Sequence, residues 1–156
     1  MATTYSTRFY NSDGSIKTGI VPFGATGHPS FEEFNETIAT TVTDGLDEHY
    51  LMPLPFTGNR RLLGLLMTAG DMDTGGPTLD ADIVYRYTLN GVAQTDVVVY
   101  DSSVAGLFSA AIAFKWHGKR LTLPAADDAR GHLIFKVGVA ATTPAAANLT
   151  VIPFWV

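Results

Sequence analysis

The pair Asn90-Gly91, set between two runs of strand-forming residues, constrains the fold of this chain more than any other feature. Asn-Gly in that setting is the strongest short-range signal for a type I′ turn, because both central residues of the turn need positive φ. We therefore predict an antiparallel hairpin with arms at residues 82–89 and 92–100. Side chains alternate between the two faces of a strand, so one face of each arm should meet a core and the other solvent or a partner.

The rest of the chain repeats the pattern of short strands separated by turn residues. From Thr18 onward, runs of about five to nine residues are bounded by Gly, Pro, Asn and Asp, the spacing of a sandwich or barrel. We predict about nine strands, near residues 18–24, 37–43, 48–54, 60–67, 80–89, 92–100, 110–117, 132–140 and 148–156. Helix is limited to about two turns after a capping box at Ser30 and Glu33, and to a turn or two in residues 102–109. The predicted fold class is all-β, an antiparallel, jelly-roll-like β-sandwich.

Both ends of the chain carry aromatic residues that need a surface to pack on. We predict an N-terminal arm at residues 1–17, with a turn at residues 11–14, and a single β-sandwich domain at residues 18–156. Residues 140–147, rich in Ala, Thr and Pro, should form the loop between the last two strands. The apolar residues 149–156 are expected to form a docked strand or a subunit contact.

Composition excludes several classes of function. The absence of cysteine removes disulfides, zinc–thiolate sites and cysteine nucleophiles. Ten Lys and Arg against 15 Asp and Glu give a net charge of −5, and without a basic cluster we expect no nucleic-acid binding. The sequence shows neither a leader nor an apolar run long enough to span a bilayer, so we expect synthesis in the cytoplasm and no membrane insertion.

One stretch partly matches a calcium-binding loop. Asp71, Asp73, Gly76 and Asp82 occupy positions one, three, six and twelve of the twelve-position motif. The match fails at Gly75, which offers no side-chain oxygen at position five, and the flanks are strand-like where the motif needs helices. We therefore favour a polar, glycine-rich loop and predict no metal site, although the sequence leaves calcium binding open.

No catalytic constellation emerges from the remaining residues. The histidines His28, His49, His117 and His132 lie far apart and match no metal-binding spacing. The nucleophile elbow and the glycine-rich phosphate loops are absent, and acidic pairs such as Asp127-Asp128 lie in turn-like contexts. We expect no catalytic, cofactor or metal residues, and hence no enzyme.

The second half of the chain resembles a class of small virion proteins. Residues 79–87 (LDADIVYRY), 98–103 (VVYDSS) and 131–137 (GHLIFKV), together with the Ala/Thr/Pro loop leading into residues 149–151, are similar to the jelly-roll decoration, or cement, proteins of tailed bacteriophages. The similarity extends over about residues 47–156. It implies a homotrimer with an N-terminal arm that binds the major capsid protein on the outer capsid surface. Such a protein bridges capsomers and stiffens the shell, acting through many weak contacts.

The candidate contact residues are taken from the aromatic and apolar residues near the two ends of the chain. They are Tyr5, Arg8, Phe9 and Tyr10 in the arm and Phe154 and Trp155 at the C-terminus. Two alternatives stay open. A carbohydrate-binding jelly roll of a phage tail or receptor-binding apparatus would stack sugars on exposed aromatic residues, with Trp116, Tyr85 and Tyr87 as candidates. A small hydrolase or cupin-like enzyme would need the histidines and carboxylates to converge in a barrel.

Overall fold

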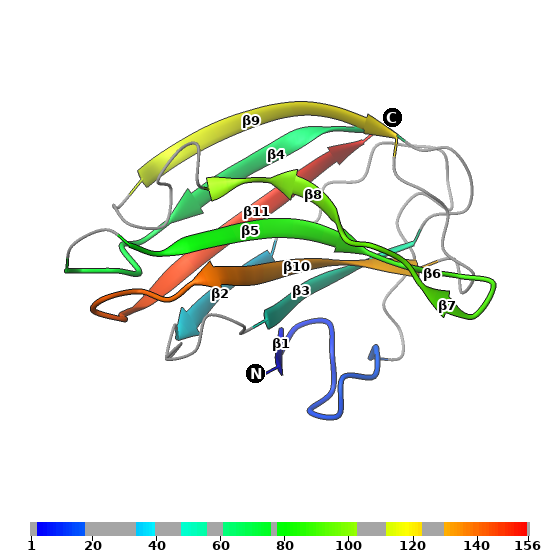
Figure 1. Ribbon diagram of the computed structural model, residues 1–156, viewed down its shortest axis with the longest axis horizontal. Helices are drawn as coiled ribbons and strands as arrows, with labels where there is room; N and C mark the ends of the chain where they lie inside the picture. The colour runs from blue at the N-terminus through cyan, green and yellow to red at the C-terminus, as the bar shows by residue number, and fades with distance from the viewer. Residues whose placement is uncertain are drawn as a thin grey trace.

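The computed structural model is a β-sandwich of two main sheets, which confirms the predicted fold class (Figure 1). It describes residues 3–17, 34–39, 48–55, 61–75, 78–102, 112–122 and 130–155. Every regular element of more than one residue among these is a strand, and no helix there has the length and apolarity to cross a membrane.

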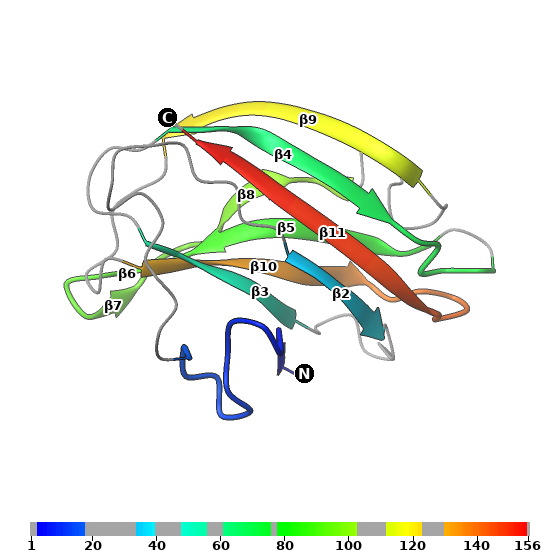
Figure 2. The same ribbon diagram turned by 180° about the vertical axis from the view of Figure 1, so that it is seen from behind.

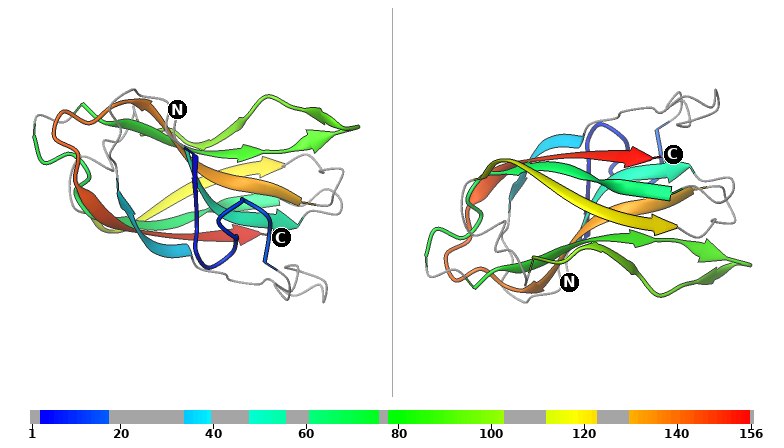
Figure 3. Two further views of the ribbon diagram at one scale, coloured as in Figure 1. Left: turned by 90° about the horizontal axis from the view of Figure 1, so that it is seen from below. Right: turned by 90° about the horizontal axis from the view of Figure 1, so that it is seen from above.

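The two sheets have separate memberships. The five-stranded sheet has the order β1 (Thr3–Tyr5), β3 (Glu48–Pro55), β10 (Arg130–Val139), β5 (Asp80–Arg86) and β8 (Val97–Tyr100). The four-stranded sheet has the order β2 (Phe34–Ala39), β11 (Ala146–Trp155), β4 (Arg61–Ala69) and β9 (Ile112–Thr122). Figures 2 and 3 show the two sheets stacked face to face. All pairings are antiparallel except that of β1 with β3, which is parallel.

The predicted hairpin forms, with one interruption in each arm. β6 (Thr88–Leu89) pairs with β7 (Val92–Ala93), and Asn90 and Gly91 have φ values of 53° and 71°, as a type I′ turn requires. Residue 87 separates β5 from β6, and residues 94–96 separate β7 from β8. The tip therefore forms a small sheet of its own, projecting beyond the sandwich at the right of Figure 1.

Several strand predictions are confirmed, and the helix expected after Ser30 can be no longer than a few residues. The strands predicted near residues 48–54, 60–67, 132–140 and 148–156 correspond to β3, β4, β10 and β11, and the predicted loop spans residues 140–145. The strand predicted at residues 37–43 begins earlier, at Phe34, so the helix expected after Ser30 does not continue past residue 33. Phe34, Glu36 and Ile38 share one face of β2. Phe34 and Ile38 are buried in the core, and Glu36 accepts a hydrogen bond from the N-terminal segment. The strand near 18–24, residues 30–33 and most of the helix at 102–109 lie outside the described residues.

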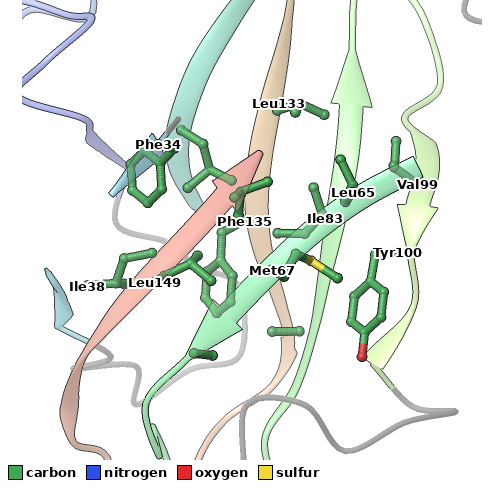
Figure 4. Packing of buried hydrophobic residues seen from close by; sticks show 14 of the residues in the cluster. Phe34, Ile38, Leu65, Met67, Ile83, Val99, Tyr100, Leu133, Phe135 and Leu149 are labelled. Atoms are coloured by element: carbon green, nitrogen blue, oxygen red, sulfur yellow. The ribbon is translucent and has the colours of Figure 1, made fainter. Parts of the chain in front are cut away.

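The core lies between the two sheets (Figure 4). Leu65 and Met67 of β4 and Leu149 of β11 are 0% exposed and face Ile83 of β5 and Phe135 of β10 across the sandwich. Each fully buried side chain of this size contributes about 1.5–3 kcal/mol relative to an exposed one. Phe9 and Tyr10, which we placed in an arm, also belong to this buried cluster. The division into an arm at 1–17 and a domain at 18–156 stays a prediction.

A single carboxylate holds together the two loops at one end of the sandwich. Asp73, in the β4–β5 loop, is 1% exposed. Its Oδ2 accepts hydrogen bonds from the backbone N–H groups of Thr78, Leu79 and Thr142 at 2.9, 3.1 and 3.2 Å, and its Oδ1 from that of Thr143 at 2.9 Å. Burial alone would raise the pKa of this carboxyl, but the four N–H donors outweigh it and hold the pKa below the ordinary value of 3.8. The β4–β5 and β10–β11 loops are thereby fixed to one another.

We predict that Asp73→Asn lowers the free energy of unfolding by at least about 2 kcal/mol, because an amide nitrogen would then face backbone donors. A carboxyl whose pKa is depressed in the folded state stabilises the fold above its unfolded pKa, and this stabilisation is lost as pH falls. The wild-type protein should therefore lose stability below about pH 4, and the variant should lack that component. Urea denaturation at pH 7 and at steps down to pH 3 measures both effects. Equal stability of the two proteins at pH 7 would contradict the assigned role of Asp73.

Candidate functional site

The N-terminal segment, residues 3–17, is docked along one edge of the sandwich (Figures 1 and 2). β1 adds a parallel edge strand to β3, with Thr3, Thr4 and Tyr5 opposite Glu48, His49 and Tyr50. The backbone N–H of Ser6 extends the pairing by donating to the carbonyl of Tyr50 at 2.8 Å. The segment thus continues the five-stranded sheet.

Glu36 attaches the same segment to the other sheet. Its Oε1 accepts hydrogen bonds from the Ser6 hydroxyl at 2.5 Å and the Arg8 N–H at 3.0 Å, and its Oε2 accepts one from the Thr7 N–H at 3.0 Å. Burial raises the pKa of the Glu36 carboxyl, but these donors outweigh it and lower the pKa from 4.5. Because Glu36 is on β2 and β1 pairs with β3, the segment bridges the two sheets at their open edge.

An aromatic cluster joins the N-terminal segment, through Tyr5 and Tyr10, to the five-stranded sheet. The ring centroids of Tyr5 and Tyr50 lie 5.0 Å apart, and that of Tyr10 lies 5.7 Å from Tyr5 and 6.0 Å from Tyr50. The Tyr10 hydroxyl is 2.9 Å from His132 Nδ1. Burial is the main reason that the pKa of Tyr10 is raised, so this hydroxyl stays protonated. Aromatic pairs at these distances stabilise by about 0.5–1.5 kcal/mol beyond their buried area.

His49 lies under β1, at the seam between the segment and the body. Its Nδ1 is 2.6 Å from the hydroxyl oxygen of Thr4, and its ring packs against Phe34 at 5.9 Å. Its buried Nε2 has no hydrogen-bond partner among the described residues. Burial lowers the pKa of His49, with the Glu36 carboxylate acting in the opposite direction. The seam therefore favours a neutral imidazole.

The predicted contact residues whose side chains are described differ in exposure. Phe9 and Tyr10 are 1% and 2% exposed, whereas Arg8 is exposed with its guanidinium carbon 5.2 Å from the Phe9 ring centroid. Tyr5 is half-buried and lines a groove of about 570 Å³ together with Thr3, Thr4, Thr7, Tyr10, Asn11, Ser12 and Lys17. Phe154 lies in β11, opposite Gly64 of β4, and Trp155 ends that strand with a side chain outside the described set. A contact role for these residues stays a prediction.

Sequence reasoning missed the largest ionic network of the described residues, which centres on Arg86. The guanidinium donates to both carboxylate oxygens of Glu48 at 2.7 Å and to both of Asp96 at 2.8 Å. Lys136 Nζ donates to Asp96 Oδ2 at 2.9 Å. The hydrogen bonds that Arg86 donates to Glu48, and next those that it donates to Asp96, raise the pKa of Arg86. Arg86 and Asp96 lie on either side of the Asn-Gly turn, at similar distances along the chain. The predicted hairpin therefore places them near each other on opposite arms, and this pair of opposite charges could have been found from the sequence.

The acidic residues that partly match a calcium-binding loop are used separately. Asp73 is saturated by backbone donors, and Asp71 Oδ1 accepts the Asp73 N–H at 3.0 Å. Asp82 groups instead with Asp80 and Asp101, each offering a carboxylate oxygen within 4.8 Å of the others. Burial is the main reason that the pKa of Asp82 is raised, and Asp101 and Asp80 add to it. Ser102 stabilises two of these carboxylates by donating hydrogen bonds, from its hydroxyl to Asp80 at 3.0 Å and from its N–H to Asp82 at 3.3 Å.

Comparison with known proteins finds similarity in structure only. No protein-family model matches the sequence, and no curated protein matches it. A chain from the capsid of Ralstonia phage GP4 is similar in fold, with a TM-score of 0.53 and 19% sequence identity over 99% of this chain and 97% of that one. A chain from the asymmetric unit of the cyanophage Pam1 capsid gives a TM-score of 0.49 and 19% identity over 90% of this chain and 96% of that one. The first match places the whole β-sandwich, including its N-terminal segment, in a fold that a phage capsid contains.

We predict that Glu36→Gln loosens the N-terminal segment without unfolding the sandwich. The amide keeps one acceptor oxygen but loses the charge, and a hydrogen bond to a charged group contributes about 1.5–3 kcal/mol. Amide hydrogen exchange at Thr7 and Arg8 should accelerate about tenfold or more, while exchange in β5 and β10 stays unchanged. Asp101→Asn serves as the control, since it removes one negative charge from an exposed carboxylate that follows β8, at the opposite edge of the sheet from β1. Unchanged protection at Thr7 and Arg8 would show that Glu36 does not hold the segment.

The same seam should loosen in acid. The folded pKa of His49 is depressed below 6.5, so its neutral form supports folding above that pH, and this support is lost as pH falls. Glu36 behaves in the same sense below 4.5. Protection factors for residues 4–8 should therefore decrease from about pH 6.5 downward and decrease further below about pH 4.5. A constant protection factor between pH 7 and pH 4 would contradict this coupling.

Proposed function

We propose that this chain is a non-enzymatic structural protein of a bacteriophage virion. In this role it is a decoration, or cement, protein that binds the major capsid protein on the outer capsid surface and bridges capsomers. The observation that carries the proposal is the fold match to a chain of the Ralstonia phage GP4 capsid over 99% of this chain. The resemblance of residues 47–156 to decoration proteins supports the same conclusion independently of the fold match.

The use of polar groups in the structure supports a contact protein. Asp73 is saturated by backbone donors, and Arg86 is held between two carboxylates. His49 and His132 contact hydroxyl groups of the N-terminal segment, at Thr4 and Tyr10. These groups fix loops and edges to one another, which gives a rigid body able to present the same surfaces to many equivalent sites.

Within this proposal the N-terminal segment is one contact region. Of the four predicted contact residues in this segment, Phe9 and Tyr10 are buried, so the two whose side chains can touch a partner directly are the exposed Arg8 and the half-buried Tyr5. Phe9 and Tyr10 then contribute indirectly, because their buried side chains hold Tyr5 and Arg8 in position. Phe154 and Trp155 at the end of β11 form the second proposed contact, between copies in a homotrimer.

A carbohydrate-binding role in a phage tail is the second candidate, and one observation favours it. The groove beside the N-terminal segment is lined by Tyr5, Tyr10 and several hydroxyl-bearing side chains, the mixture of aromatic faces and hydrogen-bonding groups that binds sugars. Glycan-array binding that is lost on Tyr5→Ala would favour this candidate over the capsid role.

Cosedimentation with capsid shells tests the main proposal. Shells are assembled from the major capsid protein of the phage that carries this chain and are mixed with the purified protein. We expect saturable binding and a higher melting temperature of the shell, together with a solution mass three times the 16.7 kDa chain mass. A protein that stays in the supernatant at every concentration would contradict the capsid role.

We predict that Arg8→Glu weakens shell binding about tenfold, equivalent to about 1.4 kcal/mol, because it reverses the charge of the exposed contact side chain. Arg61→Glu is the matched control, since Arg61 is also exposed but begins β4 in the four-stranded sheet. The bound fraction in a cosedimentation titration gives both affinities. If the two variants bind equally well, the N-terminal segment is not the contact region.

A further inference from the structure

The hairpin tip of residues 87–95 carries no charge. Its sequence, YTLNGVAQT, has no charged residue, in a chain that has 25 Lys, Arg, Asp and Glu in total, 10 basic and 15 acidic. The tip projects past the end of both sheets in Figures 1 and 3. A partner that meets this tip is therefore not selected by charge.

The tip exposes two large apolar side chains beside the polar residues Thr88, Asn90 and Thr95. Val92 is 60% exposed and Leu89 is 41% exposed, and the two lie directly opposite each other across β6 and β7. They are two of the four large hydrophobic residues that are exposed in the described part of the chain, with Val98 and Val139. A paired valine and leucine at the end of a projecting hairpin form a small apolar knob.

The knob is held rigidly. The Gln94 N–H donates to the carbonyl of Tyr87 at 3.1 Å, and the Gln94 side-chain amide donates to the carbonyl of Val92 at 3.0 Å. At the base of the hairpin, Arg86 and Asp96 form two parallel hydrogen bonds of 2.8 Å. A bidentate pair fixes orientation as well as distance, so little conformational entropy remains to be lost when the tip binds.

The size of the tip indicates what kind of partner it fits. A stable protein–protein interface uses about 20–30 residues on each side, so a nine-residue hairpin without charges cannot hold a dimer by itself. A small contact of this kind is effective when it is repeated, because each further attachment of the same assembly is intramolecular. A lattice of identical shell subunits provides that repetition, and a single second copy does not.

We propose that the hairpin docks tip first into an uncharged, apolar depression on a capsid shell subunit, with Val92 and Leu89 as the inserted side chains. This inference rests on the capsid role proposed above. It orients the molecule: the hairpin end faces the shell, and the opposite end, where Asp73 joins the β4–β5 and β10–β11 loops, faces away.

The test uses cosedimentation of Val92→Glu with shells, with Val139→Glu as the matched control. Val139 is also an exposed valine, at 50%, but it ends β10 on the side of the β10–β11 loop. Because both side chains are exposed, neither substitution should change the unfolding midpoint, which is measured alongside. We expect Val92→Glu to weaken shell binding at least tenfold and Val139→Glu to change it less than twofold. Leu89→Glu should repeat the effect of Val92→Glu.

The other outcomes separate this inference from the proposed function. If wild-type protein does not bind shells, the capsid role fails and the docking inference fails with it. If wild-type protein binds and Val92→Glu binds equally well, the capsid role stands and the hairpin inference is overturned. The inference is also overturned if both valine variants lose binding to the same degree, or if Val92→Glu lowers the solution mass of the protein alone, since the tip would then contact a second copy.

Discussion

The double bidentate pairing of Arg86 with Glu48 and Asp96 is the interaction on which both candidate contact regions depend. Glu48 on β3 is 4% exposed, and its carboxylate is 2.7 Å from the Arg86 guanidinium. Removing one member of a buried ion pair typically costs about 3–5 kcal/mol, because the other charge remains buried without compensation. The pair to Asp96 fixes the base of the hairpin. Arg86 Nη1 also donates to the Tyr50 hydroxyl at 3.3 Å, and Tyr50 is in the aromatic cluster that receives the N-terminal segment.

The two sheets of a sandwich must be held together at their open edges and ends. Here the N-terminal segment does so at one edge, and the hydrogen bonds to Asp73 do so at one end. At one edge, β1 extends the five-stranded sheet while Glu36 of the other sheet accepts three hydrogen bonds from residues 6–8. At one end, Asp73 joins the β4–β5 and β10–β11 loops, each of which connects one sheet with the other. The protein is thus braced by two carboxylates that accept hydrogen bonds from N–H donors, the buried Asp73 and the half-buried Glu36, and it has no disulfides.

The sequence predicted what depends on local patterns. The Asn-Gly turn, the loop after β10 and the positions of β3, β4, β10 and β11 all follow from turn residues and strand-forming runs. The interactions that position the candidate site are long-range. Glu36 meets residues about 30 positions away, and Arg86 meets Glu48 across 38 positions, so no local pattern reveals either one. Phe9 and Tyr10 show the same limit, because an aromatic residue near a chain end is equally consistent with a core and an interface.

Our central proposal is that the rigid β-sandwich presents its hairpin end and its N-terminal segment to a capsid shell. Amide hydrogen exchange of the protein, free and bound to shells, tests this claim most directly because it reads every surface in one experiment. The account predicts slower exchange on binding in residues 88–94 and 7–12, with exchange in residues 70–75 and 140–145 unchanged. Slower exchange confined to residues 70–75 and 140–145 would contradict it, since the opposite end of the molecule would then be the one that meets the shell.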